Sequence, residues 1–253
     1  MKRRELAMRA ISLVAALAVL LLAWALAAHL VRRPFLPGPW SAAARLAARL
    51  ADGSLALHLG ASCRRVGLAL VLAAPAAVAL GLAAGRSRRL DAFVSPFVYL
   101  LHPIPKVAFL PVIMLFLGLG DAAKVFLVGL IIFGQLLVSA RDAARAVPEA
   151  LMESMRSLGA SRAAVARHVV SPSALPSLFS GLRLSLGTAI AVLFIAESFA
   201  SETGLGWYIV DAWTRVDYPD MYAAMLALAF FGLACYLAVD AAEAALCRWR
   251  DLD

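Results

Sequence analysis

Residues 148–176 read PEALMESMRSLGASRAAVARHVVSPSALP, a charged, helix-forming segment that separates two long apolar stretches. We call this segment the insert. The chain on both sides of it is apolar enough to lie in lipid, whereas the insert is polar and long enough to form ordered structure. A polar segment of this kind between membrane spans needs a partner outside the bilayer. The insert therefore indicates both the topology of the chain and its functional class.

The composition is that of an integral membrane protein. Of the 253 residues, 63% are hydrophobic and only 16% are charged, and the mean hydropathy is +0.85. Soluble domains carry about 25% charged residues. At roughly 20 residues for each membrane-spanning helix, the chain has room for about six. We therefore expect an all-α fold, a polytopic helical bundle with about six transmembrane helices.

The positive charge is distributed unevenly along the chain. The formal net charge is +8 and the isoelectric point is near 10.0. Excess lysine and arginine in short loops marks the cytoplasmic face, so both termini and the insert are expected in the cytoplasm. The sequence shows no basic stripe with interleaved aromatic residues, and nucleic acid is not an expected partner. Fourteen of the 24 basic residues lie in segments assigned to the cytoplasmic side: Lys2, Arg3, Arg4, Arg9, Arg86, Arg88, Arg89, Arg141, Arg145, Arg156, Arg162, Arg167, Arg248 and Arg250.

Apolar runs give the order of the spans. The first has 20 uncharged residues, more than a normal signal-peptide core, so we expect a retained helix, although residues 25–27 resemble a cleavage site. The third contains four prolines that would bend it, and a bend suits either a translocation path or plain packing irregularity. The spans are expected at residues 11–30, 66–84, 93–117, 122–140, 178–200 and 221–246. The prolines of the third span are Pro96, Pro103, Pro105 and Pro111.

The segment before the second span does not fit the rule that lysine and arginine gather in the cytoplasmic loops. Residues 41–65 belong outside by the order of the spans, yet they carry four arginines, and we interpret them as an amphipathic lead-in at or near the outer surface. These arginines are Arg45, Arg49, Arg64 and Arg65. The expected parts of the chain are an N-terminal helix with an external loop (1–54), a membrane domain containing the insert (55–246) and a cytoplasmic tail (247–253).

Within the insert, the spacing predicts two short helices joined at a glycine. Gly159 fits the end of the first helix, Ser161 can cap a second helix at about 162–170, and Pro172 and Pro176 are expected to end it. The first helix has an apolar stripe consisting of Leu151, Met152, Met155 and Leu158. Its polar face, which can form ion pairs along the helix, consists of Glu149, Glu153 and Arg156. An amphipathic pair lying on the membrane surface would look similar and is the alternative.

The insert resembles the cytoplasmic EAA loop of type I ATP-binding-cassette (ABC) importer permeases. That signature runs Glu-Ala-Ala, three residues, glycine, nine residues and an Ile-x-Leu-Pro ending. The matching positions are Glu153, Ser154, Met155, Gly159, Val169, Ser171 and Pro172, with both alanines and the leucine replaced. Four further runs resemble the nitrate, sulfonate and taurine branch of these permeases, at 102–127, 157–170, 180–190 and 197–213. The resemblance covers residues 55–245.

The resemblance implies a permease that imports a small solute and binds no cofactor itself. The insert would dock on a cytoplasmic ABC ATPase dimer that binds ATP and Mg, since the sequence has no GxxxxGK[ST] phosphate loop. Other implied partners are a second permease copy in a homodimer and an external solute-binding protein, in the lipid bilayer of the bacterial inner membrane. The branch points to a sulfonate, taurine or nitrate, although relatives also carry pyrimidine precursors. The implied coupling residues are Glu149, Glu153, Ser154, Met155, Gly159, Ala160, Ser161, Val169 and Pro172.

Polar residues inside the expected spans are candidates for lining a translocation path. They are Gln135, Ser139, Ser185, Thr188 and Glu197. Glu197 lies near the outer end of its span, where solvation at the interface is an equal interpretation. The histidines and cysteines show no metal-ligand spacing and no Ser-His-Asp set is visible, so neither a metal site nor an enzyme is expected. A secondary transporter or channel would need mid-membrane carboxylates or an inverted repeat, and a membrane anchor without transport is the remaining alternative.

Overall fold

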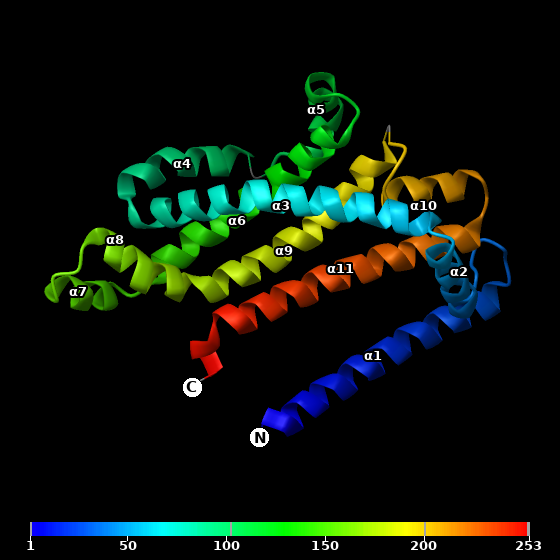
Figure 1. Cartoon of the computed structure of the whole chain (residues 1–253), viewed down its shortest axis with the longest axis horizontal. Coiled ribbons are helices and arrows are strands. Elements are labelled where there is room, and N and C mark those ends of the chain that lie inside the picture. The colour runs from blue at the N-terminus through cyan, green and yellow to red at the C-terminus, as the bar shows by residue number, and fades with distance from the viewer. Residues whose placement is uncertain (1, 102, 200, 252–253) are drawn as a thin grey trace.

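The computed structural model describes residues 2–101, 103–199 and 201–251. In these ranges the chain forms helices and no strand, which confirms the predicted all-α class (Figure 1). The long helices are α1 (Lys2–Val31), α3 (Ser54–Arg86), α6 (Asp121–Ala146), α9 (Ser171–Ser198) and α11 (Tyr218–Leu246). The short elements are α2 (Pro39–Ala51), α4 (Arg88–Leu101), the 3-10 turn η1 (Lys106–Phe109), α5 (Leu110–Leu117), α7 (Glu149–Ser157), α8 (Arg162–Val165), the π-helical turn η2 (Ala166–Val170), α10 (Leu205–Thr214) and η3 (Arg248–Asp251).

Five helical segments in the described ranges are long and apolar enough to cross a membrane. They are α1, α3, α6, α11 and the continuous helix Arg162–Ser198. A sixth span is present if α4 and the η1–α5 segment count as one, although they meet at an angle of 83°. The expected number of about six is therefore confirmed, while the third span is broken rather than bent. Pro103 and Pro105, which have no N–H to donate, stand at the break; His102, and Ala200 at the end of the expected fifth span, lie outside the described residues.

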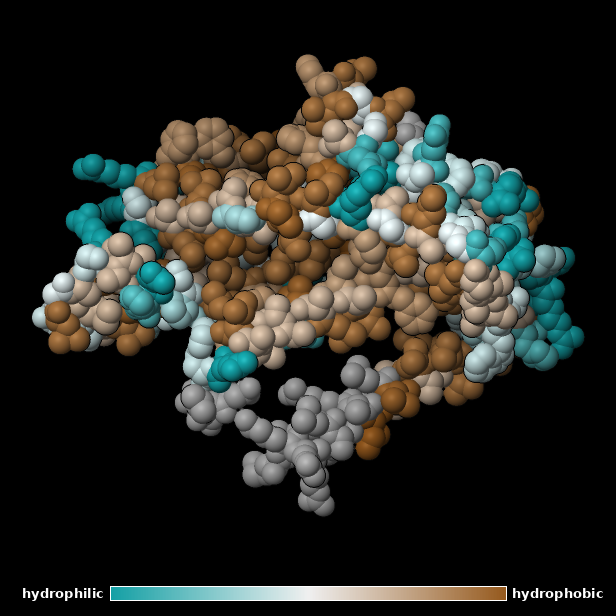
Figure 2. Space-filling model, in the orientation of Figure 1, coloured by the Kyte–Doolittle hydropathy of each residue, from teal (hydrophilic) through white to brown (hydrophobic). Residues whose placement is uncertain are grey.

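Helices α3, α6, α9 and α11 run side by side and form the body of the molecule (Figure 1). Helices α7 and α8 lie at one end of this body, which we name the insert end, and α2 and α10 lie at the opposite end. Figure 2 shows hydrophilic residues gathered at these two ends, with a hydrophobic belt between them. A bundle that crosses a bilayer requires this distribution, because lipid tails offer no hydrogen bonds to polar groups.

Helix α1 lies apart from the body and contacts α2 (Figure 1). None of the residues in its apolar stretch Val14–Val31 is buried within the chain. Trp24 holds its end in place, because Nε1 donates to the carbonyl of Pro37 at 3.0 Å and the indole stacks on Tyr222 with 5.6 Å between ring centroids. An apolar helix with so little contact to its own chain needs lipid or another protein around it.

Two glycines let α3 and α6 approach closely. A Cβ atom on Gly81 would lie 2.6 Å from the carbonyl oxygen of Leu137, and one on Gly85 would overlap the carbonyl oxygen of Arg141. The GxxxG spacing of this pair arises easily by chance in a glycine-rich helix, but here the contact with α6 needs both glycines. Close approach of the backbones at this point sets the distance between the two helices.

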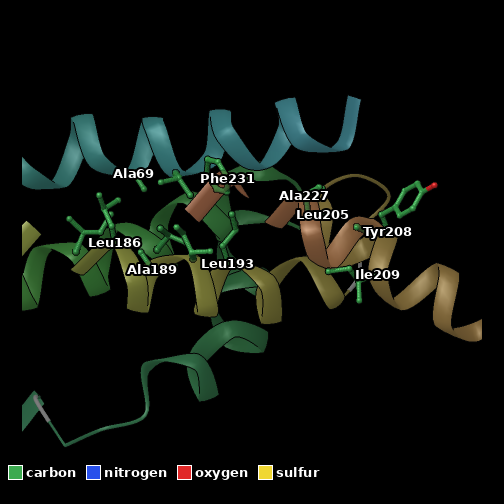
Figure 3. Packing of buried hydrophobic residues seen from close by; sticks show 14 of the residues in the cluster. Ala69, Leu186, Ala189, Leu193, Leu205, Tyr208, Ile209, Ala227 and Phe231 are labelled. Atoms are coloured by element: carbon green, nitrogen blue, oxygen red, sulfur yellow. The ribbon is translucent and has the colours of Figure 1, made fainter. Parts of the chain in front are cut away.

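The main apolar core lies farther along the same helices (Figure 3). Ala69 of α3, Leu186 and Leu193 of α9, Leu205 of α10 and Phe231 of α11 belong to it. Each of these side chains is less than a tenth exposed. The core therefore ties α3, α9, α10 and α11 into one unit, on which the polar ends are built.

One predicted boundary is wrong, and one helix is longer than its expected span. The helix of the second span, α3, begins at Ser54, twelve residues before the expected start of the span, after Gly53 turns the chain with φ +80°. The lead-in expected at 41–65 is accordingly divided, with α2 at the opposite end and residues 54–65 in the first turns of α3. Pro172 and Pro176 do not end the second helix of the insert, because α8 passes through η2 into α9. The wider π-helical turn already departs from the regular hydrogen-bond ladder, so the missing N–H of Pro172 is accommodated there.

Candidate coupling loop and translocation path

The turn of the insert has the predicted geometry. Gly159 adopts φ +80°, a conformation that residues with a Cβ rarely take, and it ends α7. The N–H of Gly159 donates to the carbonyl of Arg156 at 2.9 Å, and that of Ala160 donates to Met155 at 3.1 Å. The side chain of Ser161 accepts from the N–H of Ala164 at 3.2 Å and caps α8. The predicted glycine stop and serine cap are both confirmed.

The apolar stripe of α7 is divided between two surroundings. Met152 is only 1% exposed and packs with Ala144, Val147 and Val165, and Met155 packs against the same cluster. Leu151 and Leu158 point away from this cluster and are 50% and 83% exposed. The stripe is therefore not a single buried face: one part fixes α7 to the body, and the other part is open to a partner.

Charged residues of α7 also divide into bound and free groups. Glu149 accepts from Arg86 of α3 at 3.1 Å and from Arg156 at 3.3 Å. Glu153 is exposed, and within the described residues it makes no ion pair. Ser154, also exposed, donates its hydroxyl to the carbonyl of Ala150 at 2.8 Å. Of the remaining predicted coupling residues, Ala160, Val169 and Pro172 are half-buried.

The insert is joined to the body at three places. The ion pair between Glu149 and Arg86 reaches α3, the packing of Met152 on Ala144 reaches α6, and α8 continues through η2 into α9. A displacement of α7 would therefore act on α3, α6 and α9 at once. Sequence spacing alone predicts the helix pair but none of these attachments.

The predicted path residues fall into two groups. Gln135 of α6 donates its amide to the hydroxyl of Thr188 on α9 at 3.3 Å. Ser139, one turn nearer the insert end, packs where α6 meets Gly181, with its Cβ 2.5 Å from the place that a Cβ of Gly181 would take. A hollow of about 580 Å³ opens beside Ser139, lined also by Asp142, Ser177 and Ser180. Gln135, Ser139 and Thr188 thus form a polar line between α6 and α9.

Ser185 and Glu197 lie elsewhere. Both side chains are fully buried among helices of the same chain. The hydroxyl of Ser185 donates to the carbonyl of Gly181 at 2.8 Å, which leaves it turned toward its own helix. Glu197 is not solvated at an interface as the alternative interpretation expects, and we leave both residues out of the polar line.

Glu197 belongs to a buried network at the opposite end. It accepts from Arg65 Nη1 at 2.6 Å, from the hydroxyl of Ser62 at 2.9 Å and from the N–H of Gly206 at 2.9 Å. Arg65 also donates from Nε to Asp121 at 2.8 Å. The two buried charges are thus paired and hydrogen-bonded, the arrangement that makes burial of charge tolerable. The sequence signal that points to this network is the pair Arg64–Arg65 in an otherwise apolar helix.

Other arginines at this end, which contradict the rule that positive charge gathers on the cytoplasmic side, also form ion pairs. Arg45 forms ion pairs with Asp217 and Asp220, and Arg49 forms one with Asp220 at 2.7 Å. The hydrogen bonds that Arg49 donates to Asp220, with a smaller contribution from the one to Asp52, raise the pKa of Arg49 above its ordinary value. Hydrogen bonds from Ser54 lower the pKa of Asp52. Local acids therefore neutralise the positive charge of the opposite end.

The sequence as a whole places this architecture in a known family. Residues 77–250 match the inner membrane component of binding-protein-dependent transport systems. The chain belongs to this family. The match includes the insert and the polar line between α6 and α9, and it confirms the resemblance to ABC importer permeases. Its members are transport permeases, not enzymes. Among the described residues of this permease, no cluster of histidine, cysteine, aspartate or glutamate could hold a metal ion.

Individual relatives resemble this permease along most of its length. The taurine transport system permease protein TauC of Escherichia coli (strain K12) is 32% identical over 241 residues, which cover 92% of this permease and 88% of TauC. The putative aliphatic sulfonates transport permease protein SsuC of Bacillus subtilis (strain 168) is 29% identical over 216 residues, 85% of this chain and 78% of SsuC. The formylaminopyrimidine transport permease protein ThiX of Halalkalibacterium halodurans is 25% identical over 233 residues, 92% of this chain and 93% of ThiX.

Proposed function

We propose that this permease is the membrane-spanning subunit of an ATP-driven importer for a small organic anion, of the taurine or sulfonate type. The insert would dock on a cytoplasmic ATPase dimer, and its movement would switch the membrane domain between two orientations. Two copies of the permease would form the path between them, and an external solute-binding protein would deliver the substrate. The parts of the chain proposed for these roles are residues 1–54, the membrane domain 55–246 and the tail 247–253.

The attachment of α7 to three helices of the body is the observation that carries this proposal. The exposed Leu151, Leu158 and Glu153 offer a docking surface, while Met152 and Glu149 on the same short helix are held by α6 and α3. A rigid helix that is open on one side and attached on the other can pass motion to the body. This arrangement is expected of a coupling element and has no evident use in a plain membrane anchor.

The distribution of charge supports an insert end that faces the cytoplasm. Arg88 and Arg89, the first two residues of α4, belong to a basic insert end, whereas Arg45, Arg49 and Arg65 at the opposite end are matched by acids. Net positive charge in short loops favours the cytoplasmic side. Both termini would then lie in the cytoplasm of a bacterium, and the membrane would be its inner membrane.

The names of two relatives support an anionic substrate. TauC and SsuC are named for taurine and for aliphatic sulfonates, and the chain covers 88% and 78% of their lengths. ThiX, at lower identity, is named for a formylaminopyrimidine. We therefore take a sulfonate as the first substrate to test.

The experiment is uptake into proteoliposomes. The permease is purified with its partner ATPase, reconstituted, and supplied with radiolabelled taurine and a taurine-binding protein, with and without ATP. ATP-dependent accumulation supports the proposal. A Gly159→Pro variant, in which proline cannot adopt φ +80°, should lose uptake or ATPase docking. Full uptake and normal co-purification by that variant would remove the coupling role of the insert.

Two outcomes would replace the proposal by its alternatives. Uptake that persists without the ATPase would make the protein a secondary transporter or channel. Failure to co-purify any ATPase, together with no uptake of any solute offered, would leave a membrane anchor.

A further inference from the structure

Lys106 stands at the break in the third span. It is the first residue of η1, directly after Pro105 and three positions after Pro103. Its Cε lies 4.0 Å from the place that a Cβ of Gly134 would take, and Gly134 is halfway along α6. Lys106 also lines an apolar hollow of about 320 Å³, together with aromatic side chains such as Phe97 and Phe133. The half-buried Lys106 side chain therefore lies beside the midpoint of α6.

The ammonium group of Lys106 has spare hydrogen-bonding capacity. Its Nζ donates to the carbonyl of Leu101, the last residue of α4, at 3.1 Å. In the described parts of the chain it makes no ion pair with a carboxylate. A lysine has three N–H donors, so two remain for another acceptor. An unpaired cation inside a membrane is costly to keep and is a functional candidate by default.

A second unsatisfied polar atom lies on the neighbouring residue of α6. Gln135 donates its amide N–H to Thr188, but its Oε1 is buried and accepts no hydrogen bond from the described residues. A buried acceptor without a donor costs about 1–3 kcal/mol. The turn η1, which begins at Lys106, contacts both α6 and α9, the helices that carry Gln135 and Thr188, so the three elements meet at one point of the bundle. This point offers a cation for an acidic group and an acceptor for an N–H or O–H group.

We propose that Lys106 holds the acidic head group of the transported solute at mid-membrane, while Gln135 accepts from a donor group at the other end of the molecule. This inference rests on the proposed function and specifies its substrate contact. The ligand class is a small organic anion with an additional N–H or O–H donor, as in an aminosulfonate. The break in the third span serves the same purpose, because it brings the lysine beside the middle of α6 without a charged residue in a continuous helix.

The test compares four variants of the assembled complex. The reconstituted permease, ATPase and binding protein are given radiolabelled taurine, and the number of taurine molecules imported per ATP hydrolysed is measured. Lys106→Arg keeps the charge and should stay within about threefold of the unchanged protein. Lys106→Gln keeps a donor for Leu101 but removes the charge, and should lower the ratio at least about tenfold. Lys106→Met should lower the number of taurine molecules imported per ATP by a similar factor, and Gln135→Leu should lower that number by a smaller factor.

Lys124 provides the matched control. Its Nζ donates to the carbonyls of Leu119 and Gly120 at 2.8 and 3.4 Å, so it is a lysine that holds the turn between α5 and α6, away from the polar line. Lys124→Met should lower the yield of assembled complex and leave the transport ratio of the recovered complex unchanged. A Lys106→Gln complex that imports taurine at the normal ratio would overturn the inference. The inference would also be overturned if all three Lys106 variants imported less taurine per ATP only in proportion to a lower yield of assembled complex. Absence of taurine uptake by the unchanged protein would instead contradict the proposed substrate class.

Discussion

Arg65 and Glu197, which lie 132 positions apart in the chain, meet in a buried ion pair with 2.6 Å between Nη1 and Oε1. Both side chains are at most 2% exposed. The pair fixes α3 to the end of α9 and also holds the segment after α9, because Arg65 donates to the carbonyl of Thr203 and Glu197 accepts from the N–H of Gly206. The opposite end of the molecule is thus closed by electrostatic contacts, whereas the middle is closed by apolar packing.

Glu197→Ala should destabilise the protein strongly. Removal of one partner leaves the guanidinium of Arg65 buried with less compensation, which costs about 3–5 kcal/mol in comparable pairs. The thermal midpoint of the detergent-purified protein measures the effect. Arg65→Met combined with Glu197→Met should recover part of the loss, since no isolated charge then stays behind. A single variant as stable as the unchanged protein would show that the pair contributes nothing.

Gly81→Leu should disrupt the contact between α3 and α6. The new side chain would meet the backbone of Leu137 and the Cβ of Ala140, and overpacking of this kind costs about 1–3 kcal/mol or more. Gly67, in the same helix, is the control because nothing lies within 4 Å of an added Cβ. Gly67→Leu should be neutral or slightly stabilising, since glycine inside a helix costs about 1 kcal/mol relative to good helix formers. Equal melting temperatures for the two variants would refute the packing role of Gly81.

Substitutions at Leu158 and Met152 should separate docking from stability. Leu158→Ser removes an exposed side chain and should leave the melting temperature unchanged while less ATPase co-purifies. Met152→Ala empties a buried position and should cost about 2–5 kcal/mol. If Leu158→Ser lowered stability and left ATPase recovery intact, the exposed half of the stripe would not be a docking surface.

The ion pair between Glu149 and Arg86 should matter for coupling more than for stability. Partly exposed ion pairs contribute roughly 0–1 kcal/mol, so Glu149→Arg should melt close to the unchanged protein. It should nevertheless hydrolyse ATP with less taurine imported per ATP, because the link from α7 to α3 is lost. The double exchange Glu149→Arg with Arg86→Glu should restore part of the ratio. A normal ratio in the single variant would show that α3 is not driven through this contact.

Local patterns in the sequence were sufficient to predict the elements of the insert. Gly159 and Ser161 have the predicted roles because a helix stop and a helix cap depend on a few neighbouring residues. The positions of proline predicted the ends of helices less well. Pro103 and Pro105 accompany a break of 83° between two helices, whereas Pro172 lies inside a continuous helix. The same residue type has opposite outcomes because the neighbouring turn decides whether its missing N–H can be tolerated.

Charge at the opposite end could not be interpreted from the sequence alone. Arg45, Arg49 and Arg65 contradict a simple topology count until Asp220 and Glu197 are seen beside them. These partners come from helices more than 100 positions away in the chain. No local pattern carries such pairings, since they arise only when helices pack.

The sequence by itself determined that the chain is a helical membrane protein, where its polar insert lies and how that insert turns, because hydropathy and capping act over short stretches of chain. The tertiary structure alone decided which polar residues are buried, which are open and which are paired. It placed Glu197 in a closed network, left Leu158 exposed and set Lys106 beside Gly134. Burial and ion pairing depend on the distance between helices, and that distance is set by packing at positions such as Gly81.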